Sequence, residues 1–364
     1  MKSSILVDAS HYRASRPTGV ERYVDLLLPL LDKELRTAGV IPTYLRSEPL
    51  PHGDPLSKAE VLVIPYKRFW SNWAPRKALK MLKPDLYFTP SGIPPLRMQS
   101  KTAVTVHDLS VYQVPQAYST MDRFRQGLVL KAASRQAQVV LTPSQFVADS
   151  VRKLWGIPFT RIVVTPLAQS TELSPESRPP QHAIPKRYLL YIGRVESKKN
   201  LETIVRSHAL YRQNGGKLSL VIAGAPGYGA GALYSLVSQL PEDLVGGVKL
   251  LGYVTDPERA WLYAHATACV VPSPYEGFGI PVLEAFSAGV PVLGGDGGGV
   301  PEVLGDAGIL VPPMSPAAWV DAFTAIESPS KREELSALGT KRLGRYTWKA
   351  TAKATAAALL AALS

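Results

Sequence analysis

The stretch "RYLLYIGRVESKKNLETIVRSHALYRQNGGKLSLVIAG", residues 187–224, decides the fold class of this chain. It begins with a short apolar run, passes through a polar loop into a helical pattern of apolar residues, and ends in a second apolar run. Runs of this length suit strands that are covered on both faces, as in a parallel sheet. The stretch therefore predicts a strand, a helix and a second, parallel strand in that order.

The same alternation of strands and helices fills the chain on both sides of this stretch. Before residue 170, apolar runs such as "SILVDA" (4–9) alternate with helical patterns, and "TACVVPSP" (267–274) is one of several such runs after residue 224. We expect α/β domains at 1–172 and 188–345, a polar, proline-rich linker at 173–187 and a final helix at 346–364. Ligands of such sheets bind beyond the carboxyl ends of the strands, so the site is expected in a cleft between the domains.

Composition and charge restrict the class of protein. The chain has 364 residues, of which 46% are hydrophobic, enough for two cores. It shows no signal-peptide core and no apolar stretch of about twenty residues, so a cytoplasmic location is expected. A single cysteine, Cys269, argues against disulfides. Residues 1–170 hold 23 Lys/Arg and 12 Asp/Glu, a net charge of +11 out of the total of +12.

The stretch "YEGFGIPVLEA", residues 275–285, places two carboxylates beside a predicted helix start. Pro281 suits the first turn of a helix, so Glu276 is expected on the loop and Glu284 in the helix. Free amides between two carboxylates suit a ligand with phosphate oxygens and hydroxyls, such as a nucleotide sugar. An equally weighted alternative is that Glu276 is an ordinary loop residue and that Glu284 only favours the helix start.

Residues 272–313, "PSPYEGFGIPVLEAFSAGVPVLGGDGGGVPEVLGDAGILVPP", resemble the donor-site signature of retaining GT-B glycosyltransferases, in particular glycosyltransferase family 4. The resemblance extends to "YLLYIGRVESKKNLETIV" (188–205) and "GVKLLGYV" (247–254), and more loosely to "RPTGVERY" (16–23) and "TAVTVHDL" (102–109). It implies two Rossmann-like parallel-sheet domains that face each other across a cleft, with the C-terminal helix returning to the first domain.

The resemblance also assigns roles to residues. Glu276 holds hydroxyls of the donor sugar, Glu284 holds the ribose hydroxyls, and the backbone of Phe278, Gly279 and Ile280 takes the remaining oxygens. The other residues that the family pattern assigns to the donor or acceptor are Arg194 and Lys199 at the diphosphate, Gly19, and His107. Lys198 lies one position off the pattern and is expected to be solvated. Without the family resemblance, ordinary structural explanations also fit these residues. The basic residues would be solvated charges, Gly19 would be a turn glycine, and His107 would be a histidine bonded to a carbonyl.

The reaction implied is transfer of a glycosyl unit, with retention, from a nucleotide diphosphate sugar to a hydroxyl of a glycan or a lipid-linked acceptor. A GDP-linked mannose or a deoxymannose such as rhamnose is the expected donor, a UDP-sugar is the second choice, and bacterial polysaccharide or lipopolysaccharide assembly is the expected setting. No Asp-x-Asp occurs, so neither a metal nor a cofactor is expected.

Three alternatives stay open. An epimerase or phosphorylase could share the architecture. A dinucleotide oxidoreductase would need the glycine fingerprint that this chain lacks. A basic nucleic-acid-binding protein would use the first domain.

Residues 66–84, "YKRFWSNWAPRKALKMLKP", combine six Lys/Arg with four aromatic residues and no acid. This mixture is typical of a segment at a membrane interface, and the candidates for contact with an anionic surface are Arg76, Lys77, Lys80 and Lys83. Attachment to the inner face of the cytoplasmic membrane is therefore expected, and a nucleic-acid partner is not. A solvated basic face with a few packed aromatics is an equally weighted alternative.

Overall fold

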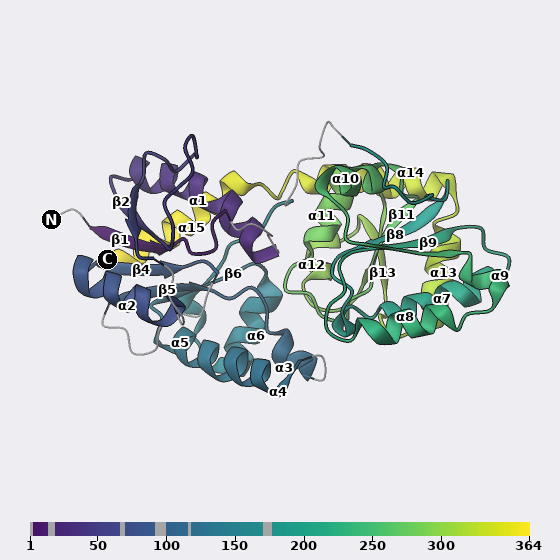
Figure 1. Ribbon diagram of the computed structural model, residues 1–364, viewed down its shortest axis with the longest axis horizontal. Coiled ribbons are helices and arrows are strands. Elements are labelled where there is room, and N and C mark those ends of the chain that lie inside the picture. Colours follow the sequence, from purple (N-terminus) through teal and green to yellow (C-terminus); the bar gives the residue numbers. More distant parts are fainter. Residues whose placement is uncertain (1–2, 14–18, 66–69, 92–99, 116–117, 170–176) are drawn as a thin grey trace. The chain divides into compact units, whose positions relative to one another are not determined.

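A computed structural model of the chain describes residues 3–13, 19–65, 70–91, 100–115, 118–169 and 177–364. The chain forms two compact units (Figure 1). The first comprises Met1–Tyr112, Thr120–Ser170 and Tyr346–Ser364, and the second comprises Gln113–Ser119 and Thr171–Arg345. Two places differ from the expected domains: among the described residues, 113–115, 118–119 and the linker residues 177–187 belong to the second unit.

The described part of the first unit is built on a seven-stranded parallel sheet in the order β3-β2-β1-β4-β5-β6-β7. Its strands are β1 (Ser4–Asp8), β2 (Ile41–Arg46), β3 (Glu60–Val63), β4 (Leu86–Thr89), β5 (Lys101–Thr105), β6 (Val139–Thr142) and β7 (Ile162–Val164). All four residues of β4 and of β6 are buried. Such burial is expected because helices cover both faces of the sheet.

Two sets of helices provide that cover (Figure 1). On one face lie α1 (Gly19–Thr37) and α15 (Trp348–Leu363), and on the other lie α2 (Trp70–Leu82), α5 (Leu130–Gln136) and α6 (Gln145–Trp155). Shorter elements are α3 (Ser110–Gln113), α4 (Thr120–Asp122), the π-helical segment η2 (Arg123–Val129) and the 3-10 turn η3 (Phe159–Arg161).

The second unit contains a six-stranded parallel sheet in the order β10-β9-β8-β11-β12-β13. Its strands are β8 (Tyr188–Ile192), β9 (Ser219–Ala223), β10 (Val248–Gly252), β11 (Ala268–Val271), β12 (Val292–Gly295) and β13 (Gly308–Val311). The strand–helix–strand order read from residues 187–224 is present as β8, α7 (Leu201–Gln213) and β9, and β8 pairs with β9 in parallel.

Helices cover both faces of this sheet as well. On one face lie α7, α8 (Ala230–Ser238) and α13 (Pro316–Ala325), and on the other lie α10 (Asp256–His265), α11 (Ile280–Ser287) and α14 (Pro329–Leu343) (Figure 1). The remaining elements are η4 (Ser197–Lys199), α9 (Glu242–Val245) and α12 (Val300–Leu304). The core between the sheet and the helices α7, α8 and α13 includes Trp319 and Phe323, both fully buried.

The C-terminal helix belongs to the first unit, although the chain reaches it from the second. Thr347 caps α15 by accepting from the amide of Ala350 at 3.2 Å. Trp348 donates its indole N–H to the carbonyl of Gln169, and α15 packs along α1. The two Rossmann-like sheets and the returning helix confirm the expected fold class. Within the residues described, no helix is both long and apolar enough to cross a membrane.

Candidate functional site

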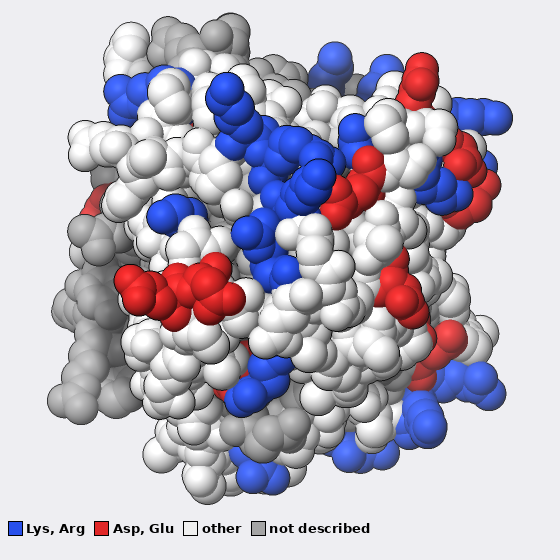
Figure 2. Space-filling view, turned by 90° about the vertical axis from the view of Figure 1, so that its right-hand side faces the viewer, with Lys and Arg blue, Asp and Glu red and all other residues white. Residues whose placement is uncertain are grey.

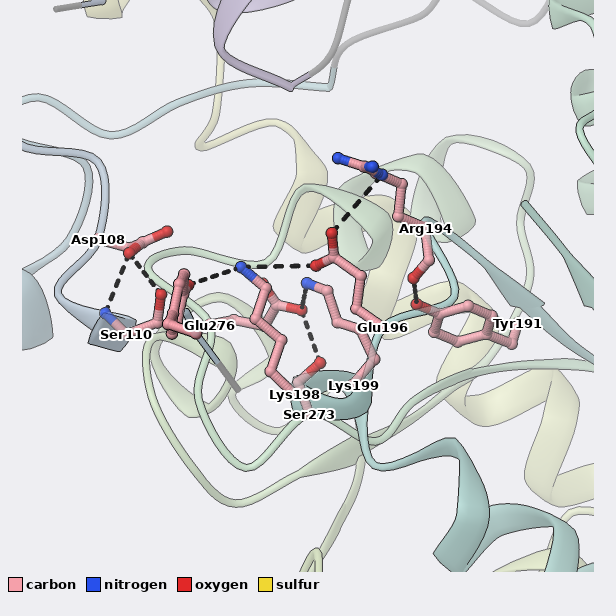
Figure 3. Close-up of polar contacts among 10 residues, drawn as sticks. Asp108, Ser110, Tyr191, Arg194, Glu196, Lys198, Lys199, Ser273 and Glu276 are labelled. Atoms are coloured by element: carbon pink, nitrogen blue, oxygen red, sulfur yellow. Dashed lines mark hydrogen bonds and ion pairs between the residues drawn. The ribbon is translucent and has the colours of Figure 1, made fainter. Parts of the chain in front are cut away.

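Basic side chains follow β8 at the carboxyl edge of the second sheet. The side chain of Arg194 is 58% exposed, and its Nε lies 3.5 Å from Oε1 of Glu196. Nζ of Lys198 lies 3.6 Å from the other carboxylate oxygen of Glu196. Glu196, which sequence analysis did not select, therefore lies between two cations (Figure 3).

Lys198 is not solvated, and that expectation is wrong. Its side chain is 20% exposed, and Nζ donates to the hydroxyl of Tyr118 at 2.9 Å. The same Nζ lies 5.1 Å from the centre of the Tyr118 ring, which adds a cation–π contact. The expectation failed because Tyr118 is 80 positions away in the sequence, in a segment that only the fold brings to the second unit.

Lys199 and Glu276 form the closest ion pair of the site. Nζ of Lys199 donates to Oε1 of Glu276 at 2.6 Å, and the hydroxyl of Ser273 donates to the same oxygen at 2.7 Å (Figure 3). The two charged side chains are 18% and 19% exposed. Partial burial strengthens such a pair because water screens it less. The structure thus brings together two residues that the sequence selected separately.

The loop that carries Glu276 is held against a second glycine-rich loop. Gly299 donates its amide to the carbonyl of Glu276 at 2.7 Å. Gly298 has a φ of +67°, and a Cβ at this position would overlap the backbone nitrogen and oxygen of Glu276. Only glycine allows this approach.

The helix α11 starts directly after that loop. Gly279 is its N-cap and Pro281 lies in its first turn, as the sequence predicted. The first N–H groups of a helix have no partner within it, and the contact of the Gly279 and Ile280 amides with a ligand stays a prediction. Phe278 is 4% exposed, so its side chain contributes to the core and only its backbone is suited to contact a ligand.

Glu284 lies in α11 and is 5% exposed. Its Oε1 accepts from Nη1 of Arg259 at 3.1 Å, and its Oε2 accepts from the hydroxyl of Tyr263 at 3.0 Å. Burial, together with the nearby Glu284 charge, holds the pKa of Tyr263 well above its usual range, so the hydroxyl stays protonated and donates. Arg259 and Tyr263 were not selected from the sequence. Their spacing of four residues indicates one face of a helix, but it does not indicate that this face contacts Glu284.

In the first unit, His107 follows β5 and is fixed by a carbonyl. Its Nε2 lies 2.7 Å from the oxygen of Pro90. Because a carbonyl only accepts, Nε2 carries the proton, and in the neutral ring Nδ1 is then an acceptor. Burial lowers the pKa of His107, which favours the neutral ring. Tyr23 packs edge-on against it, with ring centres 4.7 Å apart.

Gly19 is the first residue of α1 and is exposed. A Cβ there would meet no atom within 4 Å. The packing of the described residues therefore does not require a glycine, and its role toward a ligand stays a prediction.

The basic stretch 66–84 lies partly outside the described residues, which exclude 66–69. Arg76 and Lys77 are exposed in the middle of α2, and Lys80 and Lys83 are exposed at its end, where they flank the exposed Met81 and Leu82 in the sequence. Trp73, in contrast, packs against the core of the first unit. Part of the predicted interfacial aromatic set is thus structural.

The surface of the second unit carries both signs of charge. Figure 2 shows the side that lies to the right in Figure 1: Lys and Arg side chains gather in its upper middle, with Asp and Glu side chains directly beside them. This mixture agrees with the near-zero net charge of residues 171–345, which hold 16 Lys/Arg and 17 Asp/Glu. Among the described residues, no group of three His, Cys, Asp or Glu side chains could hold a metal ion.

Two family profiles match the chain in sequence order. "Glycosyltransferase Family 4" matches residues 17–172, and "Glycosyl transferases group 1" matches residues 175–342. A relative of nearly full length is the O-antigen chain mannosyltransferase B of Escherichia coli, 32% identical over 334 residues, which cover 87% of this chain and 82% of the relative. The chain belongs to glycosyltransferase family 4. It is a GT-B glycosyltransferase.

Other relatives of this glycosyltransferase agree with that assignment. The O-antigen chain mannosyltransferase RfbU of Salmonella typhimurium is 29% identical over 235 residues, 65% of this chain and 62% of the relative. Among solved structures, a sucrose-phosphate synthase from Thermosynechococcus elongatus superposes with a TM-score of 0.73 at 21% identity, covering 96% of both chains. WaaG, described as a glycosyltransferase involved in lipopolysaccharide biosynthesis, gives 0.65 at 16% identity, covering 97% of this chain and 98% of its own. At these identities the likeness concerns the fold.

Proposed function

We propose that this glycosyltransferase transfers mannose, with retention of configuration, from a nucleotide diphosphate sugar to a hydroxyl of a growing bacterial polysaccharide. The ion pair between Lys199 and Glu276 carries the proposal, because transfer needs a cation at the leaving diphosphate and an anion at the sugar. The donor sugar is inferred from the O-antigen mannosyltransferases that this chain resembles. GDP-mannose is the preferred donor.

The residues of the second unit divide the work. Lys199 and Arg194 neutralise the diphosphate, together with the amides of Gly279 and Ile280 at the start of α11. Oε1 of Glu276 is held by Lys199 and Ser273, and the described residues provide no partner for its Oε2. Oε2 accepts from hydroxyls of the donor sugar. In the first unit, Nδ1 of His107 accepts from a sugar or acceptor hydroxyl.

The bond changes follow from this placement. The bond between C1 of the sugar and the phosphate oxygen breaks, and its electron pair stays on the diphosphate. The acceptor oxygen bonds to C1 on the same face, and its proton passes to a phosphate oxygen of the leaving group. The positive charges at the diphosphate replace the metal that other phosphate sites use, so transfer is expected to persist in EDTA.

Glu276→Gln tests the proposal because it keeps the shape of the side chain and removes its charge. We expect transfer from GDP-mannose to fall by about a hundredfold or more, with the fold intact by circular dichroism. Glu334→Gln, which changes an exposed glutamate on α14, is the matched control. Activity of the Glu276 variant within threefold of the unmodified enzyme would refute the role, and an inverted anomeric product by NMR would refute retention.

We further propose that the first unit contacts an anionic membrane surface. Exposed basic residues at the end of α2 lie next to exposed Met81 and Leu82. On α4 and η2, which continue into α5, Met121, Phe124 and Leu128 are 65%, 56% and 57% exposed at helical spacing. Apolar side chains that point outward beside basic ones suit the interface of an anionic bilayer. Each Lys or Arg near such a surface contributes on the order of 1 kcal/mol.

Co-sedimentation with vesicles tests this second proposal. We expect binding to vesicles rich in phosphatidylglycerol and none to neutral vesicles at low salt, and weaker binding at high salt. Changing Arg76, Lys77, Lys80 and Lys83 together to Gln should reduce binding, whereas the same change at the exposed Lys217 and Lys249 of the second unit should not. Binding that ignores lipid charge, or that is tighter for RNA or DNA, would contradict it.

A further inference from the structure

Glu196 places a negative charge among the cations that follow β8. Its Oε1 lies 3.5 Å from Nε of Arg194, and its Oε2 lies 3.6 Å from Nζ of Lys198 (Figure 3). The side chain of Glu196 is 17% exposed, whereas that of Arg194 is 58% exposed. The carboxylate is therefore much more enclosed than the guanidinium that it faces.

The glycine-rich loop after β9 holds Glu196 in place. On one side of Glu196, Ser197 donates its amide to the carbonyl of Tyr228 at 2.9 Å. On the other side, the carbonyl of Val195 accepts from the amide of Gly227 at 2.8 Å. A Cβ at Gly227 would lie 2.6 Å from Cγ of Glu196, so the glycine leaves room for this side chain against the loop. The backbone and the side chain of Glu196 are thus both confined.

Lys198 orders the carboxylate further. Its Nζ, which faces Oε2 of Glu196, also donates to the hydroxyl of Tyr118 at 2.9 Å, and its side chain is 20% exposed. The contact of Glu196 with Lys198 is therefore the more ordered of its two contacts, and the contact with the exposed Arg194 is the one that can be exchanged. A phosphate oxygen and a carboxylate oxygen are alternative partners for the same guanidinium.

We propose that Glu196 competes with the diphosphate of the nucleotide for Arg194 and thereby hastens release of the nucleoside diphosphate after transfer. The inference rests on the proposed function above, which assigns Arg194 to the diphosphate. A phosphate oxygen that binds this guanidinium has to replace a carboxylate oxygen as its partner. The carboxylate stays nearby because the loop after β9 confines it, and its charge opposes that of the phosphates. Both effects weaken the binding of the nucleoside diphosphate.

Such a competitor serves the reaction. Cations that stabilise the diphosphate while its bond to the sugar breaks also hold the diphosphate after the bond has broken. Release of product then becomes a slow step of turnover, as in many enzymes. A confined carboxylate beside the more exposed of the two cations reduces this hold and leaves the pair of Lys199 and Glu276 untouched.

Calorimetric titration with GDP tests the sign of the effect. We expect Glu196→Gln to bind GDP about three- to tenfold more tightly than the unmodified enzyme, because the variant keeps the shape of the side chain and loses the competing charge. The binding of guanosine should not change. Glu334→Gln, which removes an ion-paired carboxylate from α14, is the matched control and should change neither affinity. Glu196→Ala also removes the carboxylate, should tighten GDP as well, and covers the case in which Glu196→Gln does not fold.

Stopped-flow displacement of bound GDP measures the release itself. We expect GDP to leave Glu196→Gln about three- to tenfold more slowly than it leaves the unmodified enzyme, because affinity differences between variants of one site arise mostly in the rate of dissociation. High salt should reduce the difference.

The opposite sign would overturn the inference. If Glu196 orients Arg194 for the phosphate, or only supports the fold, Glu196→Gln binds GDP more weakly or equally, and the proposed function stands. Equal tightening of GDP and guanosine would also overturn the inference, because the effect would then not concern the diphosphate. Failure of the unmodified enzyme to bind any nucleoside diphosphate would overturn both.

Discussion

Lys199 and Arg194 follow the same strand and carry the same charge, but the structure holds them differently. Lys199 is 18% exposed and bonded to Glu276 at 2.6 Å, whereas Arg194 is 58% exposed and lies 3.5 Å from Glu196. A cation that is already ordered and partly desolvated loses less entropy on binding a phosphate than one that moves in water. The two should therefore differ in their contribution to diphosphate binding.

Replacing each cation by alanine checks this difference. We expect Lys199→Ala to weaken the binding of GDP by about ten- to a hundredfold, and Arg194→Ala to weaken it less. The binding of guanosine should change little in either variant, because only the diphosphate contacts these charges. Lys217→Ala, at an exposed lysine beyond α7, is the control. Equal losses for GDP and guanosine, measured by calorimetry, would mean that these side chains support the fold instead.

At the scale of elements, two loops at the carboxyl edge of the second sheet make one unit. The loop after β11 carries Glu276, the loop after β12 carries the glycines, and Gly299 bonds to the carbonyl of Glu276. The glycines lie close to the backbone of the first loop, so they set the position of the loop that carries Glu276.

Gly298→Ala should therefore displace the loop that carries Glu276. The new Cβ overlaps the backbone of Glu276, and the positive φ adds strain of about 1–3 kcal/mol. We expect a melting temperature lower by a few degrees and a loss of transfer of at least about tenfold. The control is Gly231→Ala in α8, where a Cβ meets nothing within 4 Å. Unchanged transfer by Gly298→Ala would show that the position of this loop does not matter.

At the scale of the whole molecule, the chain crosses between its units more than once. The described residues 113–115 and 118–119 belong to the second unit, and α15 returns from the second unit to the first. The buried face of α15 includes Thr351, Thr355 and Leu359, and it covers a face of the first sheet. The first unit is thus incomplete without the end of the chain.

A stop codon in place of Tyr346 tests this dependence. Loss of α15 exposes apolar surface of α1 and of the sheet, so we expect the first unit to unfold at a markedly lower temperature. The second unit, which keeps all its strands, should retain a separate transition in calorimetry and should still bind GDP. A single transition at the original temperature would contradict this division of stability.

Much of the fold and part of the site could be predicted from the sequence, because the signals are local. Each of these signals spans no more than about a dozen consecutive residues: the apolar runs of β8 and β9, Pro281 at the start of α11, and the carboxylate stretch. Periodicity and turn chemistry act over that range, so they are readable one segment at a time. The same is true of the family signature, which gave the fold class correctly.

The tertiary structure alone decided which side chains meet. Lys198 contacts Tyr118, Lys199 contacts Glu276, and Arg259 contacts Glu284, across 80, 77 and 25 positions of sequence. From the sequence, a charged residue is expected to be solvated, because its neighbours in the sequence do not reveal a distant partner. In the fold a partly buried charge needs a partner, because an unpaired buried charge is costly. The sequence determined the strands, the helices and the residue types at their ends. The tertiary packing determined the pairs, because parallel strands bring distant loops to one edge and the helices that cover a sheet contact one another.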